Sequence, residues 1–195
     1  MPAGKTKRKK KKNKQPKGGR FDETAYIKQS VRQLPFNEAL INEDWHESGI
    51  AHVTVSRSKS NGQLVIATFI LDLYALGLRD CAYYLAMAPD EYEDEFLPQI
   101  YRAYESEIVE TEPDEASALV YGAVDYGKQN GFKPDKTFKL AQFFLESRAA
   151  IMTDYAFEFG KDGRPTYFER PGDQTSLILS TLNRTLGEGN YDYIS

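Results

Sequence analysis

The stretch that decides the fold is residues 49–81, GIAHVTVSRSKSNGQLVIATFILDLYALGLRDC. After Gly49, apolar side chains recur at every second position and alternate with a more polar set, which is the pattern of a β-strand with two unlike faces. Asn61-Gly62 then supplies the signal for a tight hairpin turn. The following run, residues 64–71, LVIATFIL, suits a central strand that is covered on both faces. The sequence therefore predicts an antiparallel hairpin here.

Helical patterns lie on both sides of this hairpin. Asp22 can cap a first helix whose apolar side chains share one face and which Pro35 closes. The segment between Phe36 and Ser48 is predicted to be irregular or helical, with Trp45 as a core anchor. A helical middle is expected to start at residues 79–88 and to resume after Pro89.

A longer helix is the best marked of these segments. Pro113 fits its first turn, and Asn130-Gly131 supplies a left-handed stop. Asp135 can cap one further helix before the chain returns to strand patterns.

A second hairpin is predicted near the C-terminus. Its strands are residues 156–159 and 166–168, and Gly160-Lys161-Asp162-Gly163 forms its turn. Asp173 is expected to cap a last helix that stops at Gly187, and residues 191–194 form a short final strand. Two antiparallel hairpins with a helical middle and a C-terminal helix define an α+β fold, formed by a single domain over residues 21–195.

The charge of the chain is divided between a basic tail and an acidic body. Residues 1–20 hold ten basic side chains and no acid, whereas the other 175 residues carry 15 basic against 29 acidic side chains, a formal charge of -14. The tail has almost no apolar side chains, so it cannot bury enough surface to offset chain entropy and we expect it to be disordered. The basic residues are Lys5, Lys7, Arg8, Lys9, Lys10, Lys11, Lys12, Lys14, Lys17 and Arg20.

Composition excludes several classes of protein. Cys81 is the single cysteine, so neither an intramolecular disulfide nor paired thiolate ligands for zinc can form. The longest apolar run stops at Asp72, well short of the ~20 residues that a membrane-spanning helix needs. A Pro/Gly exit follows the basic block where a signal peptide would be apolar, so we expect a cytoplasmic protein without a membrane association.

The basic tail is the strongest functional signal. Flexible Lys and Arg side chains neutralise phosphates and release counterions, and RNA is the commonest cytoplasmic polyanion. No aromatic side chain interleaves the lysines, so we expect no base-specific contacts from the tail. The leading hypothesis is a non-enzymatic accessory protein that associates with RNA or ribosomes through Lys5, Lys7, Arg8, Lys9, Lys10, Lys11, Lys12 and Lys14.

Two carboxylates offer an enzymatic alternative. Asp72 follows the apolar run, and with Asp80 and Glu47 it could hold Mg²⁺ or Mn²⁺ for hydrolysis of a phosphodiester. The competing interpretation is structural: Asp72 would accept amide hydrogens from the turn at residues 74–77 or pair with Arg79, as buried acids ordinarily do. No other cofactor is indicated, because the chain has neither a phosphate-binding loop nor a nucleophile elbow.

Three remaining side chains have a possible chemical role. His46 and His52 are general-base candidates without a visible nucleophile, and Cys81 is expected to be a packed thiol. A third functional class is an acidic protein-binding module, such as an inhibitor or antitoxin-like partner. Its docking surface for a basic protein would be residues 90–95.

Three segments, residues 49–81, 118–138 and 157–193, resemble a family of uncharacterised bacterial proteins. Asp72-Leu73-Tyr74 with Leu76-Gly77, and Gly131-Phe132 with Pro134, are the most specific points of this resemblance. The family often has Cys at position 75 and Lys at position 79, where this chain has Ala75 and Arg79, so a thiol-based role at position 75 does not carry over. The resemblance implies a bacterial, cytoplasmic protein with a shared fold and transfers no activity.

Overall fold

An antiparallel sheet of five strands in the order β4-β3-β2-β1-β5 is the centre of the protein. In the computed structural model, residues 21–104 and 106–195 are described. The strands are β1 (Phe36–Asn42), β2 (Ile50–Ser58), β3 (Leu64–Asp72), β4 (Gly77–Met87) and β5 (Ile108–Glu110). The predicted hairpin is confirmed, since β2 and β3 pair without interruption from Ile50↔Asp72 to Ser58↔Leu64. The α+β class is confirmed as well.

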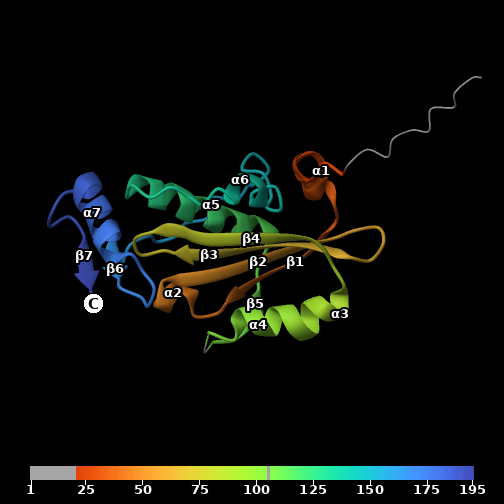
Figure 1. The fold of residues 1–195 in the computed structure, drawn as a ribbon, viewed down its shortest axis with the longest axis horizontal. Helices are drawn as coiled ribbons and strands as arrows, with labels where there is room; N and C mark the ends of the chain where they lie inside the picture. Colours follow the sequence, from red (N-terminus) through yellow and green to blue (C-terminus); the bar gives the residue numbers. More distant parts are fainter. Residues whose placement is uncertain (1–20, 105) are drawn as a thin grey trace, which may run out of the picture.

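Helices cover both faces of the sheet (Figure 1). One face carries α1 (Glu23–Ser30), α5 (Pro113–Gln129) and α6 (Phe138–Ala141). The other face carries α3 (Pro89–Glu91), the wide-turn helix η2 (Tyr92–Phe96) and α4 (Leu97–Tyr101). Two short elements, η1 (Val31–Gln33) and α2 (Trp45–Ser48), flank β1 in the sequence.

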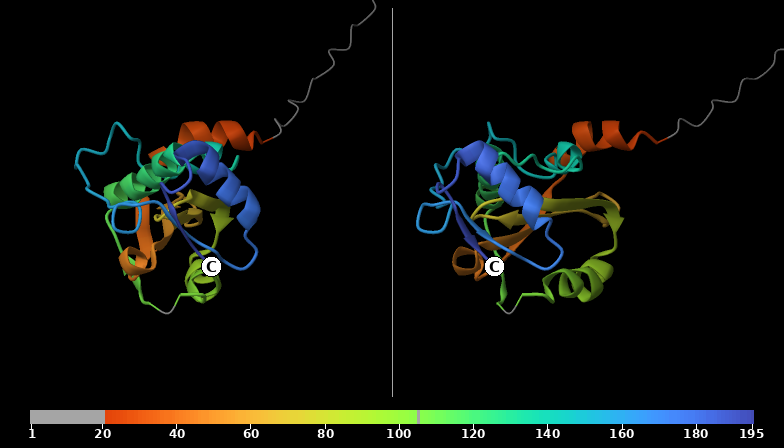
Figure 2. Two further views of the ribbon diagram at one scale, coloured as in Figure 1. Left: turned by 90° about the vertical axis from the view of Figure 1, so that its left-hand side faces the viewer. Right: turned by 60° about the vertical axis from the view of Figure 1, so that its left-hand side comes forward.

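A small C-terminal unit packs at one end of the sheet (Figure 2). It consists of β6 (Thr166–Phe168), α7 (Thr175–Leu186) and β7 (Asp192–Ile194), and β6 pairs with β7 in parallel. The predicted final strand and last helix are thus confirmed. Tyr167 and Leu182 are fully buried and form the centre of the unit's own apolar cluster.

The alternation of side chains in the hairpin builds the main core. Odd-numbered residues of β2 and β3, such as Val53 and Phe69, face α5 and are fully buried against Leu119 and its neighbours. The even-numbered residues of β2 from His52 to Ser58 are polar, and on this face Tyr101 of α4 contacts His52 and Thr54. Both faces of β3 are covered, as predicted for a central strand.

Two predicted segments are wrong in type. The segment after Pro35 is strand β1, although Trp45 is the buried anchor that was expected. Residues 79–87 of the segment 79–88, which was predicted to begin a helix, belong to β4, because pairing with β3 along almost the whole strand outweighs local helical spacing. Bulges in this pairing, between Leu64/Ile66 and between Ile70/Leu71, obscure the period of two in the sequence.

The second predicted hairpin is also wrong. Its turn exists, because Lys161 and Arg164 form an isolated bridge around Asp162 and Gly163. Residues 156–159 nevertheless have no strand partner: Phe157 packs on Trp45, and Phe159 stacks on Tyr126. The apolar alternation in this segment therefore reflects burial against α5 and α2.

Helix α5 approaches the turn between β3 and β4 at two glycines. Gly77 has a φ of +72°, and a Cβ atom placed on it would lie 2.3 Å from the carbonyl oxygen of Ala123. A Cβ atom on Gly127 would lie 2.6 Å from the carbonyl oxygen of Leu76. These contacts involve backbone on both sides, so no side-chain movement can relieve them.

We predict that Gly127→Ala destabilises the protein, although alanine is the better helix former by about 1 kcal/mol. Overpacking against the Leu76 carbonyl should lower the free energy of unfolding by roughly 1–3 kcal/mol, measured by urea denaturation. Gln129→Ala, at an exposed position of the same helix, is the control and should stay within about 0.5 kcal/mol of wild type. Equal stability of the Gly127 variant and wild type would contradict the close approach.

Candidate functional site

The turn between β3 and β4 is held by many hydrogen bonds. Asp72 starts the turn, and its side chain is buried with 4% exposure. Its Oδ1 accepts hydrogen bonds from the backbone amides of Tyr74, Ala75 and Leu76 at 3.1, 2.8 and 3.3 Å. The structural interpretation of Asp72 is therefore what the geometry shows: the carboxylate closes the turn.

The outward carbonyls of this turn receive donors from distant segments. The Leu73 carbonyl accepts the Gly160 amide at 2.8 Å, and the Tyr74 carbonyl accepts the Thr166 amide at 2.9 Å. Tyr126 of α5 donates its hydroxyl to the same Tyr74 carbonyl at 3.1 Å. The Asn130 side chain donates to the Ala75 carbonyl at 2.8 Å. We call residues 72–77 the turn hub, because α5, the 156–168 segment and the sheet all bond to it.

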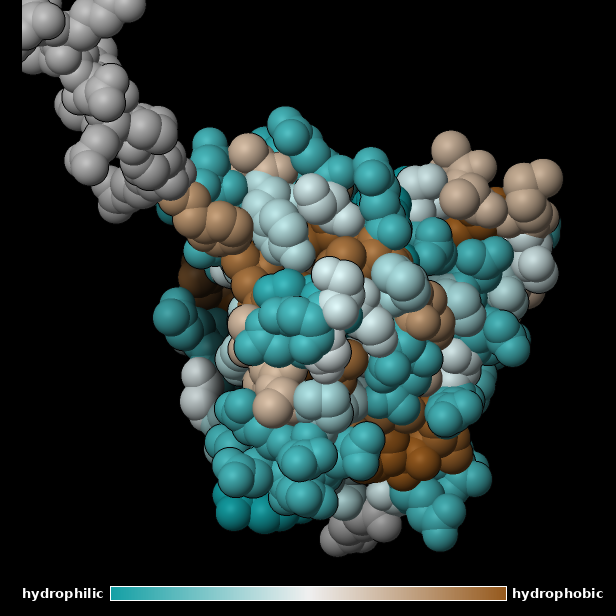
Figure 3. All heavy atoms as spheres, turned by 90° about the vertical axis from the view of Figure 1, so that its right-hand side faces the viewer, coloured by the Kyte–Doolittle hydropathy of each residue, from teal (hydrophilic) through white to brown (hydrophobic). Residues whose placement is uncertain are grey.

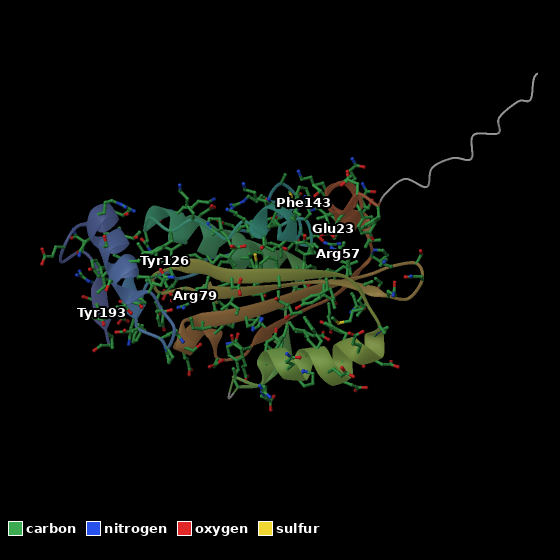
Figure 4. All side chains as sticks on the ribbon, in the orientation of Figure 1. Glu23, Arg57, Arg79, Tyr126, Phe143 and Tyr193 are labelled. Carbon is green, nitrogen blue, oxygen red and sulfur yellow. The ribbon has the colours of Figure 1, made fainter. Side chains whose placement is uncertain are left out.

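Arg79 connects the turn hub to the C-terminal unit. Its Nη1 lies 3.6 Å from Asp72 Oδ2, and its Nη2 forms an ion pair with Asp173. Asp173 also accepts the Tyr167 hydroxyl at 2.9 Å and the Arg170 amide at 3.1 Å. Figure 4 shows Arg79 and Tyr126 at the end of the sheet that faces this unit, with Tyr193 beyond them. Asp173 does not cap α7 as predicted; Gln174 stands at that position.

The two carboxylates of this network differ in their electrostatics. Burial raises the pKa of Asp72, against the lowering effects of the amides of Ala75 and Leu76 and of the positive charge of Arg79. The pKa of Asp173 is lowered, because hydrogen bonds from Arg79 and Tyr167 outweigh its burial. Arg79 is therefore held chiefly by Asp173, the better charge partner.

The predicted metal ligands are not brought together. Asp80 is exposed on β4 opposite Ile70, and its Oδ1 accepts the amide of Cys81 at 2.8 Å. Glu47 is exposed on α2, where its carbonyl accepts the Tyr74 hydroxyl. In residues 21–104 and 106–195, no three His, Cys, Asp or Glu side chains form a group that could hold a metal ion. The hydrolase hypothesis stays a prediction. Its two main carboxylates, Asp72 and Asp80, accept hydrogen bonds from backbone amides.

The other predicted chemical groups lie apart from one another. His46 is exposed and stacks on Trp45, with ring centroids 3.3 Å apart. His52 is buried beneath α4. Cys81 is the packed thiol that was expected, and burial raises its pKa to about 12, which keeps it protonated.

A cleft of about 480 Å³ lies beside the turn hub. It is bordered by Trp45, His46, Tyr74, Glu158 and Lys161, among other residues. Lys161 lies over the ring of Phe168, 5.0 Å from its centroid. The lining combines aromatic rings with charges of both signs and offers neither a nucleophile with an adjacent base nor a concentrated positive charge. The sequence patterns did not point to this cleft, because its walls come from three separated segments.

The acidic segment, residues 90–95, lies on α3 and η2. Its five carboxylates, on Asp90, Glu91, Glu93, Asp94 and Glu95, are all exposed, and none has an ion-pair partner within 4.0 Å in the part of the chain that is described. Figure 3 shows hydrophilic side chains gathered over the lower left of this end of the molecule, beside a hydrophobic patch at the lower right. Tyr92 points the other way and is buried with 1% exposure, so one face of the segment anchors it and the other is free.

The basic residues 5–14, proposed to contact RNA, lie outside the described residues. The expectation of disorder concerns residues 1–20, which are outside them as well, so it stays a prediction. Among the helices that the structure does describe, none is both long and apolar enough to span a membrane.

Comparison with known proteins adds no family or activity to this geometry. No protein-family model, no curated protein and no solved structure matches the chain.

We predict that Asp173→Asn lowers the free energy of unfolding by roughly 2–3 kcal/mol, because Arg79 loses its charge partner in a largely buried position. The lowered pKa of Asp173 means that its stabilisation is present above the usual aspartate range and is lost as pH falls below it. The difference between variant and wild type should therefore shrink under acid, measured by denaturation at pH 7 and pH 3.

Asp125→Asn is the matched control. It also removes an aspartate–arginine pair, with Arg148, but both side chains are about half exposed and the expected cost is about 0.5 kcal/mol. Similar losses for the two variants would show that burial does not distinguish the pairs.

Proposed function

We propose that this chain is a non-enzymatic accessory protein of the cytoplasm that associates with RNA, including ribosomal RNA, through its basic residues 5–14. One observation carries the proposal: the ten basic side chains of residues 1–20 stand without a single acid, while the remainder has a formal charge of -14. A polyanion is attracted to the first region by charge neutralisation and counterion release and is repelled by the second. The basic region thus recruits RNA, and the acidic body does not lie along it.

The partners of the body's arginines support this division of roles. Arg57 is buried and donates to the carbonyls of Phe144, Arg32 and Leu34, while pairing with Glu146. Arg79 is occupied by Asp173, and Arg148 by Asp125. These guanidinium groups stabilise the fold and are not presented together on one surface. An RNA phosphate backbone would therefore pair with the basic side chains of residues 1–20.

We predict that Lys9, Lys10, Lys11 and Lys12 together control the salt dependence of RNA binding. Replacing all four by Gln in the full-length protein should weaken binding to single-stranded poly(U) at 50 mM salt. It should also reduce the slope of log K against log salt by about 3, since each phosphate contact contributes about 0.7. Fluorescence anisotropy over a salt series measures both quantities.

A control with the same change in net charge places four Gln residues on the body, at Lys28, Lys133, Lys136 and Lys139, which are all exposed. It should leave the slope unchanged. Equal effects from the two variants would show that net charge, and not residues 9–12, governs binding, and no RNA binding by the wild-type chain would refute the proposal.

A second role is favoured by the carboxylates of residues 90–95, which have no ion-pair partner among residues 21–104 and 106–195 and can dock a basic protein while residues 5–14 hold RNA. Exposed charges without internal partners are available for long-range steering of a cationic partner. Such docking would be compatible with RNA association, because the acidic segment attracts a cationic protein, whereas the basic residues attract the RNA polyanion.

We predict that reversing Glu93, Asp94 and Glu95 to Lys weakens binding to a poly-L-lysine probe by about tenfold or more at low salt. Reversal of three exposed acids elsewhere, Glu112, Glu158 and Glu188, gives the same net charge and should change binding by less than about threefold. Surface plasmon resonance measures both variants. An equal loss in both would assign binding to overall charge and remove the docking role.

A further inference from the structure

The second face of the sheet is polar and yet buried. Along β2 this face presents His52, Thr54 and Ser56, which are 6%, 0% and 0% exposed. Their cover is the stretch of residues 89–104, which contains α3, η2 and α4 and which we call the flap. Figures 1 and 2 show the flap as a separate layer beneath the sheet, on the side opposite α5.

Polar atoms in this interface lack the partners that burial normally requires. Within the described chain, neither ring nitrogen of His52 has a hydrogen-bond partner, and the hydroxyl of the buried Tyr92 lies near Ser56 and Glu38 without a hydrogen bond of normal geometry. Buried polar groups are nearly always satisfied, and an unsatisfied one lowers stability. The flap therefore closes over the sheet at a cost that the main core on the other face does not carry.

The attachment of the flap depends on few groups. Within the described chain, no backbone hydrogen bond joins residues 89–104 to the sheet. The Tyr101 hydroxyl is the main polar anchor, in contact with the carbonyls of Leu40 and His52 and with Thr54 Oγ1 at 3.2, 3.0 and 3.0 Å. Tyr92 provides the apolar anchor, packed on Leu64, Ile66 and Met87.

Fixed points lie at both ends of the flap. It begins directly after β4, and beyond it Ser106 donates to Asp44 and the Glu43 amide donates to the Glu107 carbonyl. Inside the flap, the Leu97 amide donates to the Tyr92 carbonyl across a wide five-residue turn. Such turns are weak points in a helix and are often found at functional sites.

We propose that the flap is released by acid: protonation of His52 detaches residues 89–104 from the sheet while the sheet and its α5 face stay folded. The released flap would expose the polar face of β2 and the rings of Tyr92 and Tyr101.

The surroundings of His52 give the direction of this change. From the flap, the rings of Tyr101 and Tyr104 face it, with centroids 5.2 and 5.7 Å away, and neither supplies a negative charge. From the sheet, Ile70 lies opposite it on β3, Thr54 lies beside it on β2, and Asn42 Oδ1 is engaged by the His52 amide. Of the charged groups nearby, Arg170 and Asp44 act on Tyr104 with opposite signs. Among residues 21–104 and 106–195, no group lies within hydrogen-bond distance of the ring to accept from an imidazolium ion.

Linkage converts this environment into a pH dependence. Burial lowers the pKa of His52 to about 4, against 6.5 when it is exposed. A folded-state pKa below the exposed value means that closure is favoured at high pH and weakens as pH falls from about 6.5 to about 4. Between pH 8 and pH 5 the opening equilibrium should rise about thirtyfold. Glu38 works in the opposite direction, because burial raises its pKa and its protonation favours the closed state.

Hydrogen exchange by mass spectrometry tests the proposal on the full-length protein. After correction for intrinsic exchange rates, amides of residues 92–104 should exchange about thirtyfold more readily at pH 5 than at pH 8, while amides of α5 and β2 stay protected. Equal protection of the flap at both pH values would overturn the proposal. Simultaneous exposure of α5 would also overturn it, because it would indicate global unfolding.

Two variants assign the effect to His52. His52→Gln cannot titrate and should abolish the pH dependence. If this variant does not fold, His52→Phe is the substitute, because it presents a non-titrating aromatic ring to Tyr101 and Tyr104. Glu38→Gln is the control for the opposing group and should leave the acid release intact or increase it. Persistence of the full thirtyfold change in a folded His52 variant would assign the response to another residue. Release of the flap and RNA binding by residues 5–14 are independent properties.

Discussion

The carboxylate of Asp72, bound by three successive amides of its own turn, is the constraint on which the rest of the structure depends. By accepting from Tyr74, Ala75 and Leu76, it directs the turn's carbonyls outward, where separate segments can reach them. α5, the 156–168 segment and Asn130 all bond to these carbonyls. The cost of burying a charge is offset here because the carboxylate replaces backbone partners that the turn could not otherwise find.

The two faces of the sheet beside this hub are covered in different ways. The α5 face of the sheet is closed by apolar side chains, with Val53, Phe69 and Leu119 essentially inaccessible. The face toward the flap is closed over Thr54, Ser56 and His52, and the ring nitrogens of His52 have no hydrogen-bond partner in the part of the chain that is described. Stability is therefore concentrated on one side of the sheet, and any local opening is expected on the other. The acidic segment lies on that more weakly held layer.

Local patterns predicted the parts of the fold that depend on neighbours in sequence. The Asn61-Gly62 signal and the alternation around it predicted the β2–β3 hairpin, and Asn130-Gly131 ended α5 correctly. The alternative role for Asp72, as an acceptor of turn amides, was also readable, since an acid after a long apolar run needs donors nearby. Strands β1 and β4 were misassigned, because their state is decided by pairing with β2 and β3 and not by their own spacing.

The sequence by itself determined the α+β class, the central hairpin and the division between a basic N-terminal region and an acidic remainder, because composition and short-range periodicity suffice for these. Only the tertiary structure decided that Asp173 pairs with Arg79, 94 residues away, that residues 166–168 pair in parallel with β7, and that His52 lies beneath the flap. Those contacts join segments far apart in the chain, and no local pattern encodes which distant surface a given side chain will meet.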